Sequence, residues 1–337
     1  MNLFETIIMG IIQGVAEFLP ISSSGHLCFG KYVLGLNTEV DMLYDVMLHI
    51  GTLIAVFIAF WEDIKELIIE GIGIVRDIFI NLFIAVSSFF SRNSKENSEN
   101  IDNDILQTSS NKKSVDEDEQ IKHAQEQVHN NELNVKYNSH NKSYRKILGT
   151  PYRRFVALII VSTIPTGIMG VCFGDLIDKA SETVLIPGIC LLMTGVLLRI
   201  ADITKPGTLD AQTTPYKKAG LVGIAQGFAT LPGLSRSGTT ITACLLCGFN
   251  KAYAVKYSFI MSIPAILGAA VLEIADFDDT INSDLILNYL VGTVVAGVVG
   301  YVCIKTMLKI VKDKKFIGFS IYCFVVGAIA IAYHFIH

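Results

Sequence analysis

Long apolar runs separated by short polar stretches are the dominant pattern along this chain of 337 residues. Each run approaches or reaches the roughly 20 residues that an α-helix needs to cross the hydrocarbon core of a bilayer. We therefore expect six membrane-spanning helices. They lie at Met42–Phe60, Phe155–Phe173, Val184–Ile200, Tyr253–Ile274, Leu285–Ile304 and Phe316–Phe335.

Two further apolar segments are interrupted, and they resemble each other. Gly10–His26 recurs without a gap as Gly223–Thr239, with eight of 17 positions identical. Each copy has an apolar stretch, a proline and then a serine-rich turn containing glycine. Interrupted segments at matching positions of two halves of a membrane protein indicate a functional site where the halves meet.

The polar stretch at residues 91–152 contrasts with the rest of the chain. It is rich in Asn, Ser, Lys and Glu, and such a composition buries too little apolar surface to offset the entropy of ordering. We predict a mostly disordered insert. Ile64–Phe90 precedes it and carries several charges, which suits a helix lying along the membrane interface. The predicted organisation is a first repeat at 1–90, the insert at 91–152, two linking spans at 153–218, the first of which closes repeat one, and a second repeat at 219–337.

Loop charges predict an orientation for these elements. Lys and Arg concentrate in the insert and in the loops around Lys205 and Lys309, whereas Asp175–Glu182 and Glu273–Asp284 are acidic. Basic loops remain in the cytoplasm, so the insert and the lysine-rich loops are expected there, in a multi-pass protein of the inner (plasma) membrane. The first interrupted segment then begins outside and the second begins inside.

This arrangement favours re-entrant hairpins over full crossings for the two interrupted segments. Full crossings would place basic loops outside, and irregular backbone at membrane depth is tolerated where it is buried in protein or lines a wet cavity. The predicted fold class is an all-α integral membrane protein with six transmembrane helices and two re-entrant helical hairpins in an inverted-topology repeat. The alternative is two ordinary spans kinked at proline.

Composition adds little to this picture. Hydrophobic residues make up 51% of the chain and charged residues 17%, and the net charge of −4 is carried mostly by loops. We expect the bilayer as a partner and no nucleic acid, and the sequence identifies no protein partner. Cys244 and Cys247 are spaced like a redox or metal pair, but small residues at a helix contact explain them better. The chain has no Walker loop, zinc signature or dinucleotide fingerprint.

The two serine-rich turns carry the candidate chemistry. Ser22 and Ser235 are natural N-caps for the second helix of each hairpin. Capping does not explain three consecutive serines, or Arg236 within apolar sequence, since a cation at membrane depth is costly and usually functional. Two helix N-termini with an arginine between them favour a phosphate. The alternative for Arg236 is a structural ion pair with Glu17.

Glu17 and Ser23 suggest a reaction as well as binding. Glu17 follows Gln13 by one helical turn, and a base beside a hydroxyl at an anion site is the arrangement for nucleophilic attack on phosphorus. His26 lies close enough to transfer a proton, although a lone histidine at an interface is more often solvated. The expected catalytic residues are Ser23, Glu17, His26 and Arg236. The expected substrate-binding residues are Ser22, Ser24, Gln13, Gln226, Ser235, Ser237, Thr240 and Asp45, the last with simple solvation as its alternative.

These paired motifs resemble those of the bacterial undecaprenyl-pyrophosphate phosphatase, or bacitracin-resistance, family. The resemblance rests on Gln13 and Glu17 followed by Phe18–His26, and on Leu231–Thr240. It implies an integral membrane phosphatase that converts the C55 isoprenyl pyrophosphate to its monophosphate and so recycles the lipid carrier of cell-wall synthesis. It also implies Ser23 as nucleophile, Arg236 as phosphate ligand, and a divalent cation, Mg²⁺ or Ca²⁺, with Glu17 as its ligand.

The chain departs from that family at two positions and in one segment. Gln13 stands where some members have Glu, Cys323 stands where many have Arg, and the insert is atypical. Despite these departures, the function that the resemblance implies is hydrolysis of undecaprenyl pyrophosphate. The alternatives are a transporter or flippase of polyisoprenyl phosphate, since inverted repeats with broken helices are also typical of carriers, and a scaffold for partners of the insert.

Overall fold

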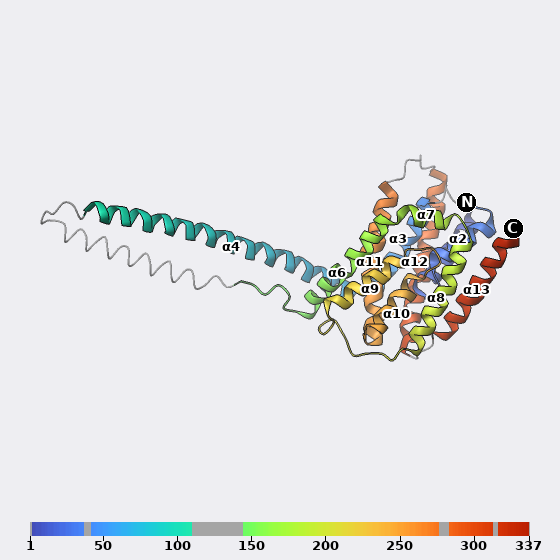
Figure 1. Ribbon diagram of the computed structural model, residues 1–337. Coiled ribbons are helices and arrows are strands. Elements are labelled where there is room, and N and C mark those ends of the chain that lie inside the picture. The colour runs from blue at the N-terminus through green and yellow to red at the C-terminus, as the bar shows by residue number, and fades with distance from the viewer. Residues whose placement is uncertain (1, 37–41, 110–143, 276–282, 313–315, 337) are drawn as a thin grey trace. The chain divides into compact units, whose positions relative to one another are not determined.

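The computed structural model describes residues 2–36, 42–109, 144–275, 283–312 and 316–336. Over these ranges the regular structure is helical, apart from a β-bridge between Leu209 and Phe249 (Figure 1). The chain divides into two units. One comprises Met1–Ile68 with Arg154–His337, and the other is Ile69–Arg153.

All six apolar runs are helices, as the sequence predicts. Five of them are long and apolar enough to span a membrane on their own, whereas the first, α3, meets that condition only together with the helix that follows it across a bend of 89°. The protein is thus an all-helical membrane protein with five, or up to six, candidate spans. The six helices are α3 (Met42–Ala59), α6 (Pro151–Cys172), α8 (Leu185–Ile203), α11 (Lys251–Ala275), α12 (Ser283–Lys312) and α13 (Ile317–Ile336).

Each interrupted segment forms two short helices joined by a turn. A proline lies in the turn that follows the first helix of each pair, and a serine N-cap starts the second helix. The first pair is α1 (Leu3–Phe18) and α2 (Ser23–Leu34), and the second is α9 (Tyr216–Phe228) and α10 (Arg236–Leu246). Gly35 and Gly248, which lie just past α2 and α10, both have positive φ, of 65° and 86°. The matching of the two segments therefore extends beyond the 17 residues that the sequence comparison covers.

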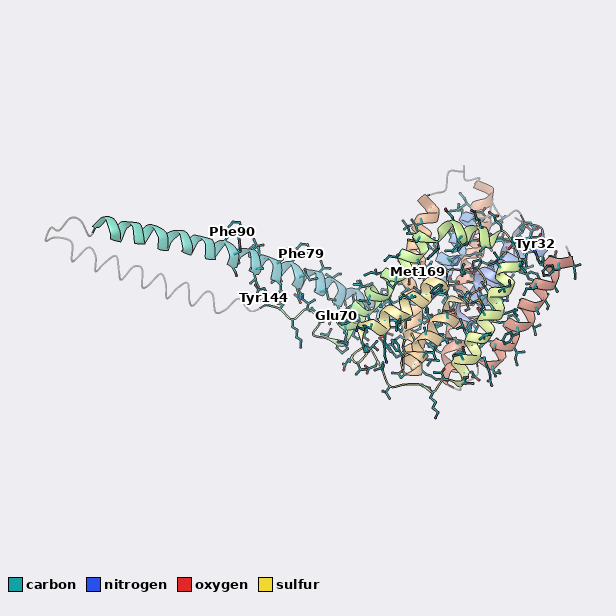
Figure 2. All side chains as sticks on the ribbon, in the orientation of Figure 1. Tyr32, Glu70, Phe79, Phe90, Tyr144 and Met169 are labelled. Atoms are coloured by element: carbon teal, nitrogen blue, oxygen red, sulfur yellow. The ribbon has the colours of Figure 1, made fainter. Side chains whose placement is uncertain are left out.

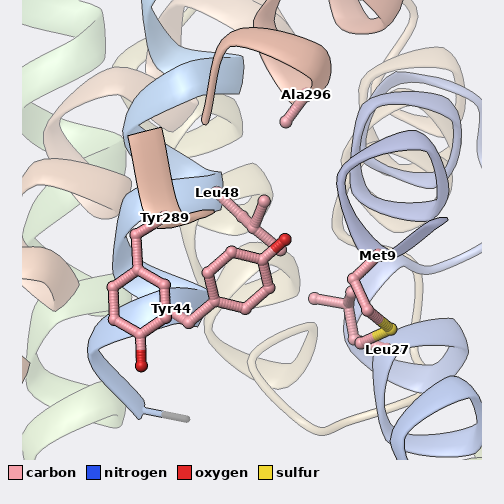
Figure 3. Packing of buried hydrophobic residues seen from close by; sticks show 6 residues of the cluster. All are labelled: Met9, Leu27, Tyr44, Leu48, Tyr289 and Ala296. Atoms are coloured by element: carbon pink, nitrogen blue, oxygen red, sulfur yellow. The ribbon is translucent and has the colours of Figure 1, made fainter. Parts of the chain in front are cut away.

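The first helix of each pair packs against a long helix of the other half of the chain. α1 lies along α12, which also packs on α3, and Met9, Leu27, Tyr44, Leu48, Tyr289 and Ala296 form a buried cluster there (Figure 3). α9 in turn contacts α6, where the Thr166 hydroxyl donates to the Gly223 carbonyl at 2.9 Å. The helices that lead into the two turns are therefore both held against a long helix.

Matching tyrosines anchor α1 and α9. Tyr44 donates to the Thr6 carbonyl at 2.7 Å. Tyr257, which stands 213 positions after Tyr44, bonds the Ser162 hydroxyl, and Ser162 donates to the Ala219 carbonyl at 2.9 Å. Ala219 also stands 213 positions after Thr6. The two corresponding carbonyls are therefore both bonded, that of Thr6 directly by Tyr44 and that of Ala219 by Ser162, which Tyr257 contacts.

The helix α4 (Trp61–Ser109) continues further than the sequence predicts, into the segment expected to be disordered. Residues 91–109 contain neither Gly nor Pro, and extending an existing helix avoids the cost of nucleation. Residues 110–143 of the predicted insert lie outside the described residues. Glu70, Phe79 and Phe90 lie along α4 (Figure 2), and both phenylalanines are exposed.

The second unit is held by a charge cluster. Arg153 bonds Glu70 at 2.7 Å and Asp77 at 2.8 Å, and Arg145 bonds Asp77 at 3.1 Å. These bonds join the start of α6 and the preceding residues to α4. The short helix α7 (Gly174–Ser181) belongs to the first unit and links α6 to α8.

Candidate active site

The two serine-rich turns have matching hydrogen bonds. The hydroxyl of Ser22 accepts from the N–H of Gly25 at 3.3 Å, and that of Ser235 accepts from the N–H of Gly238 at 3.1 Å. Both serines are therefore N-caps, as the sequence predicts. Their hydroxyls also lie 3.3 Å and 3.4 Å from those of the serines two positions later, Ser24 and Ser237. The sequence duplication has produced two helix N-termini of the same local structure.

The turns touch each other. A Cβ atom added to Gly25 would lie 2.9 Å from the Cα of Gly233, and one added to Gly238 would lie 3.3 Å from the Cβ of Pro20. The Gly233 N–H also donates to the Ser24 hydroxyl at 3.4 Å. Positive ends of two helix dipoles thus meet at one place, which favours an anion.

Gly233 is the position in this contact that tolerates a side chain least. Its φ is 89°, and a Cβ would overlap the carbonyl oxygen of Pro187 in α8. We predict that Gly233→Ala lowers the free energy of unfolding by at least about 2 kcal/mol, because left-handed strain adds to overpacking. The measurement is thermal unfolding in detergent. Gly170→Ala is the control, since no atom lies within 4 Å of that added Cβ; equal unfolding temperatures for the two variants would contradict the prediction.

Glu17 joins the two turns. Its Oε2 accepts from the Ser23 hydroxyl at 2.6 Å and from Gln13 Nε2 at 3.1 Å. Its Oε1 forms an ion pair with Nη2 of Arg236. The Glu17 side chain is only 5% exposed. The structure therefore places three of the four expected catalytic residues in one contact, with the ion pair that the sequence left as an alternative for Arg236.

Several polar atoms in this region are buried without a hydrogen-bond partner. They include Nη1 of Arg236, Oε1 of Gln13 and the hydroxyl of Thr239. Buried polar atoms in native proteins almost always have partners. The unused Nη1 donor of Arg236 and the unused Oε1 acceptor of Gln13, both on side chains that contact Glu17, are thus available to a ligand.

His26 lies beside the first turn, but its ring is occupied. Nδ1 is 2.8 Å from the Ser22 carbonyl oxygen, and Nε2 is 2.9 Å from the hydroxyl of Tyr322 in α13. The ring nitrogens thus contact Ser22 and Tyr322 rather than Ser23 or Glu17. A different histidine, His49 of α3, has its Nε2 4.0 Å from Glu17 Oε2.

The remaining expected substrate-binding residues have partners of their own. Asp45 accepts from Lys31 at 2.6 Å, and its second oxygen is buried without a partner. Gln226 donates to Thr166 at 3.3 Å. Thr240 bonds Ser258 at 2.6 Å and its own helix backbone, so its hydroxyl fixes α10 on α11 rather than facing Glu17.

Sequence reasoning missed several residues that contact the turns or other expected site residues. Thr194 of α8 donates to the Gly233 carbonyl at 3.0 Å and accepts from the Ser235 N–H at 2.9 Å. Lys31, Thr239 and Tyr322 were missed as well. The available signal for Thr239 was its position in the duplication, where it corresponds to His26. Thr194, Lys31 and Tyr322 lie outside the two motifs and had no signal of this kind.

The side chains of this site offer few ligands for a divalent cation. In the part of the chain that the structure describes, no group of three or more His, Cys, Asp or Glu side chains could hold a metal. Glu17 is a single carboxylate whose two oxygens have partners, and Gln13 Oε1 is the nearby acceptor without one. Such a donor set suits an ion that is held mainly by phosphate oxygens, as Mg²⁺ often is.

The arrangement has a definite chemical capacity. A hydroxyl bonded to a carboxylate is a nucleophile next to its base, and a guanidinium on the same carboxylate binds phosphate oxygens well. The two converging helix N-termini add positive potential. The site is therefore suited to displacement at phosphorus.

Comparisons with known proteins agree with this chemistry. The model of the family described as "Bacitracin resistance protein BacA" matches residues 6–89 and 128–329. A relative from Methanosphaera stadtmanae is 34% identical over 331 residues, which is 98% of each chain, and one from Alkaliphilus metalliredigens is 34% identical over 99% of each. A relative from Bacteroides fragilis is 32% identical over 98% of each. All three relatives are named undecaprenyl-diphosphatase.

Proposed function

The chain belongs to the family of the bacitracin resistance protein BacA, and from this premise we propose that it hydrolyses undecaprenyl diphosphate. The products are undecaprenyl phosphate and inorganic phosphate, and the reaction returns the lipid carrier to cell-wall synthesis. The observation that carries the proposal is the contact of Ser23 and Arg236 with the two oxygens of one carboxylate, Glu17.

The first chemical step follows from that contact. The diphosphate enters between the two turns and takes Arg236 as its ligand, so Glu17 loses its counter-ion and receives the proton of Ser23. The Ser23 oxygen attacks the terminal phosphorus, a phosphoserine bond forms, and the bond from that phosphorus to the bridging oxygen breaks. Undecaprenyl phosphate leaves with the bridging oxygen. Arg236 and the two helix N-termini stabilise the charge on the transferred phosphoryl group.

The second step regenerates the serine. Glu17 passes the proton from Ser23 to the departing undecaprenyl phosphate and so becomes a carboxylate again. A water molecule then gives a proton to Glu17 and attacks the phosphoserine phosphorus. The bond from phosphorus to the Ser23 oxygen breaks, inorganic phosphate leaves, and Ser23 takes its proton back from Glu17. Arg236 serves both steps, because the same equatorial oxygens carry the charge in each. The lipid tail lies among the apolar spans.

A divalent cation fits this scheme if it binds together with the diphosphate. Mg²⁺ commonly binds through one or two carboxylates together with substrate phosphates, and Glu17 with the free Oε1 of Gln13 would hold it here. When bound, such an ion neutralises phosphate charge.

We also propose that the α1–α2 and α9–α10 hairpins are re-entrant and enter a plasma membrane from opposite faces. Loop charges support this topology, and so do the contact of the two turns and the packing of α1 on α12 and α9 on α6. The insert and the lysine-rich loops are then cytoplasmic.

Cysteine labelling tests this topology. Asp175 lies at the start of α7 and Lys205 lies just after the end of α8, and both residues are exposed. With the exposed Cys172 changed to Ser, Asp175→Cys should react with a membrane-impermeant thiol reagent on intact cells. Lys205→Cys should react only after permeabilisation. The reverse pattern would contradict the predicted orientation. Labelling of both cysteines on intact cells would contradict the prediction that the basic loops are cytoplasmic.

A second candidate function is movement of a polyisoprenyl phosphate across the bilayer, which the paired, broken helices favour. Purified chain in detergent separates it from hydrolysis, because no bilayer gradient exists there. We expect phosphate release from undecaprenyl diphosphate under these conditions, at a rate that depends on Ser23. Absence of release in detergent, with lipid movement in vesicles of the same preparation, would favour the carrier.

A further inference from the structure

His26 is held in one tautomer by its neighbours. A carbonyl oxygen only accepts hydrogen bonds, so the contact of His26 Nδ1 with the Ser22 carbonyl at 2.8 Å requires the proton on Nδ1. In the neutral ring Nε2 is then the acceptor, and the Tyr322 hydroxyl at 2.9 Å must be its donor. The direction of both bonds follows from the partners.

This ring supports a strained turn. Ser22 has a φ of 72°, the one non-glycine residue with positive φ in the described part of the chain. Its carbonyl accepts from both the backbone N–H of His26 at 3.2 Å and the ring Nδ1. A residue in this conformation persists where its surroundings fix it. Ser23, the next residue, is the one whose hydroxyl reaches Glu17.

The helix α13 contacts this turn at two points. The ring of Tyr322 stacks on that of His26, with centroids 5.6 Å apart and planes 8° apart. The neighbouring Cys323 is fully buried, and its Sγ lies 3.9 Å from the Pro20 carbonyl oxygen. The first turn is therefore supported from a helix that follows it by about 300 positions.

The second turn has a comparable support. There the Thr194 hydroxyl of α8 bonds the backbone of Gly233 and Ser235 directly. A long helix from a distant part of the sequence fixes each turn in this way, and α8 and α13 pack on each other. The difference is that α13 acts on the first turn through a histidine side chain.

We propose that Tyr322 is a positioning residue for the reaction. Its hydroxyl and ring hold His26 with Nδ1 on the Ser22 carbonyl, and this keeps the positive-φ turn that aims Ser23 at Glu17. The expected effect of Tyr322 on kcat rests on the proposed function. The tautomer of His26 does not, because it can be measured without turnover.

The kinetic test is Tyr322→Phe, which keeps the stacked ring and removes the hydroxyl. We expect kcat to fall about 10- to 100-fold, because a misplacement of about 1 Å costs on the order of 100-fold in rate, with KM changed less than about threefold. Tyr333→Phe is the matched control. Tyr333 lies on the same helix and contacts Phe29 and Tyr32 of α2 edge-on, and we expect kcat close to that of the wild type.

Two further results decide the mechanism. In a His26→Ala background, Tyr322→Phe should change kcat by less than about twofold, since a residue that acts through another loses its effect when that residue is gone. An equal fall in both backgrounds, or a wild-type kcat for Tyr322→Phe, would overturn the proposal.

The tautomer is measured without turnover, so that failure of the proposed function is distinguishable. Nitrogen NMR of histidine-labelled chain, with the His26 signals assigned by their loss in His26→Gln, should show a protonated Nδ1 and an unprotonated Nε2. Tyr322→Phe should shift the Nε2 resonance, and Tyr333→Phe should leave it in place. A protonated Nε2 in the wild type would overturn the inference even if the chain releases phosphate normally.

Discussion

The Ser23→Ala variant is expected to hydrolyse undecaprenyl diphosphate at least about 10³-fold more slowly than the wild type, because removal of a nucleophile that works with its base abolishes the covalent route. The fall should appear in kcat measured as phosphate release in detergent. Folding should be preserved, since Glu17 Oε2 keeps its bond from Gln13 at 3.1 Å and Oε1 keeps Arg236.

Ser24→Ala is the comparison variant for this result. Ser24 also lies in the first turn of α2, yet its hydroxyl has only contacts of 3.3 Å with the Ser22 hydroxyl and 3.4 Å with the Gly233 N–H. Its loss of rate should be far smaller than that of Ser23→Ala. Near-normal turnover by Ser23→Ala would remove the covalent step and leave direct attack by water.

Arg236→Ala is expected to have two large effects. Loss of the guanidinium should lower kcat by about 10³- to 10⁵-fold, the range found for arginines that stabilise a transferring phosphoryl group. It also leaves the buried Glu17 carboxylate without its cation, which should cost about 3–5 kcal/mol of unfolding free energy. Phosphate release and thermal unfolding in detergent measure the two effects separately.

A double variant separates charge pairing from catalysis. Glu17→Gln combined with Arg236→Gln removes both charges, so stability should recover to within about 1–2 kcal/mol of the wild type while activity stays lost. Arg236→Lys keeps a charge but loses the fork-shaped donor, and it should retain an intermediate rate. Recovery of activity together with stability in the double variant would show that the pair is structural.

Much of this site is predictable from one sequence because the duplicated motif is local. Pro20 and Pro232 interrupt the two helical segments, Ser22 and Ser235 cap the helices that follow, and both effects depend on residues close by in the chain. That Ser23 and Arg236 lie near each other follows once two matching turns are assumed to pack together, and in the structure both contact Glu17. The six long helices are predictable for a similar reason, since length and apolarity are properties of each segment alone.

Residues that act across the fold were not predictable in this way. Tyr322 lies on an apolar span where a tyrosine is unremarkable, and its partner His26 is 296 positions away. Thr194 likewise has no local signal for its contact with the second turn. The ion pair of Asp45 with Lys31 was also not predictable, because the sequence does not show which charges on neighbouring helices face each other, and the expected role of Asp45 at the substrate stays a prediction.

The shared use of one diphosphate by the two turns is tested most directly by a double-mutant cycle on kcat/KM with Ser23→Ala and Arg236→Lys. If both side chains act on the same phosphoryl group, their effects are strongly non-additive, and the double variant should be slower than Ser23→Ala by less than about threefold. A double variant whose loss equals the product of the two single losses would show that Ser23 and Arg236 act independently, and would contradict the account.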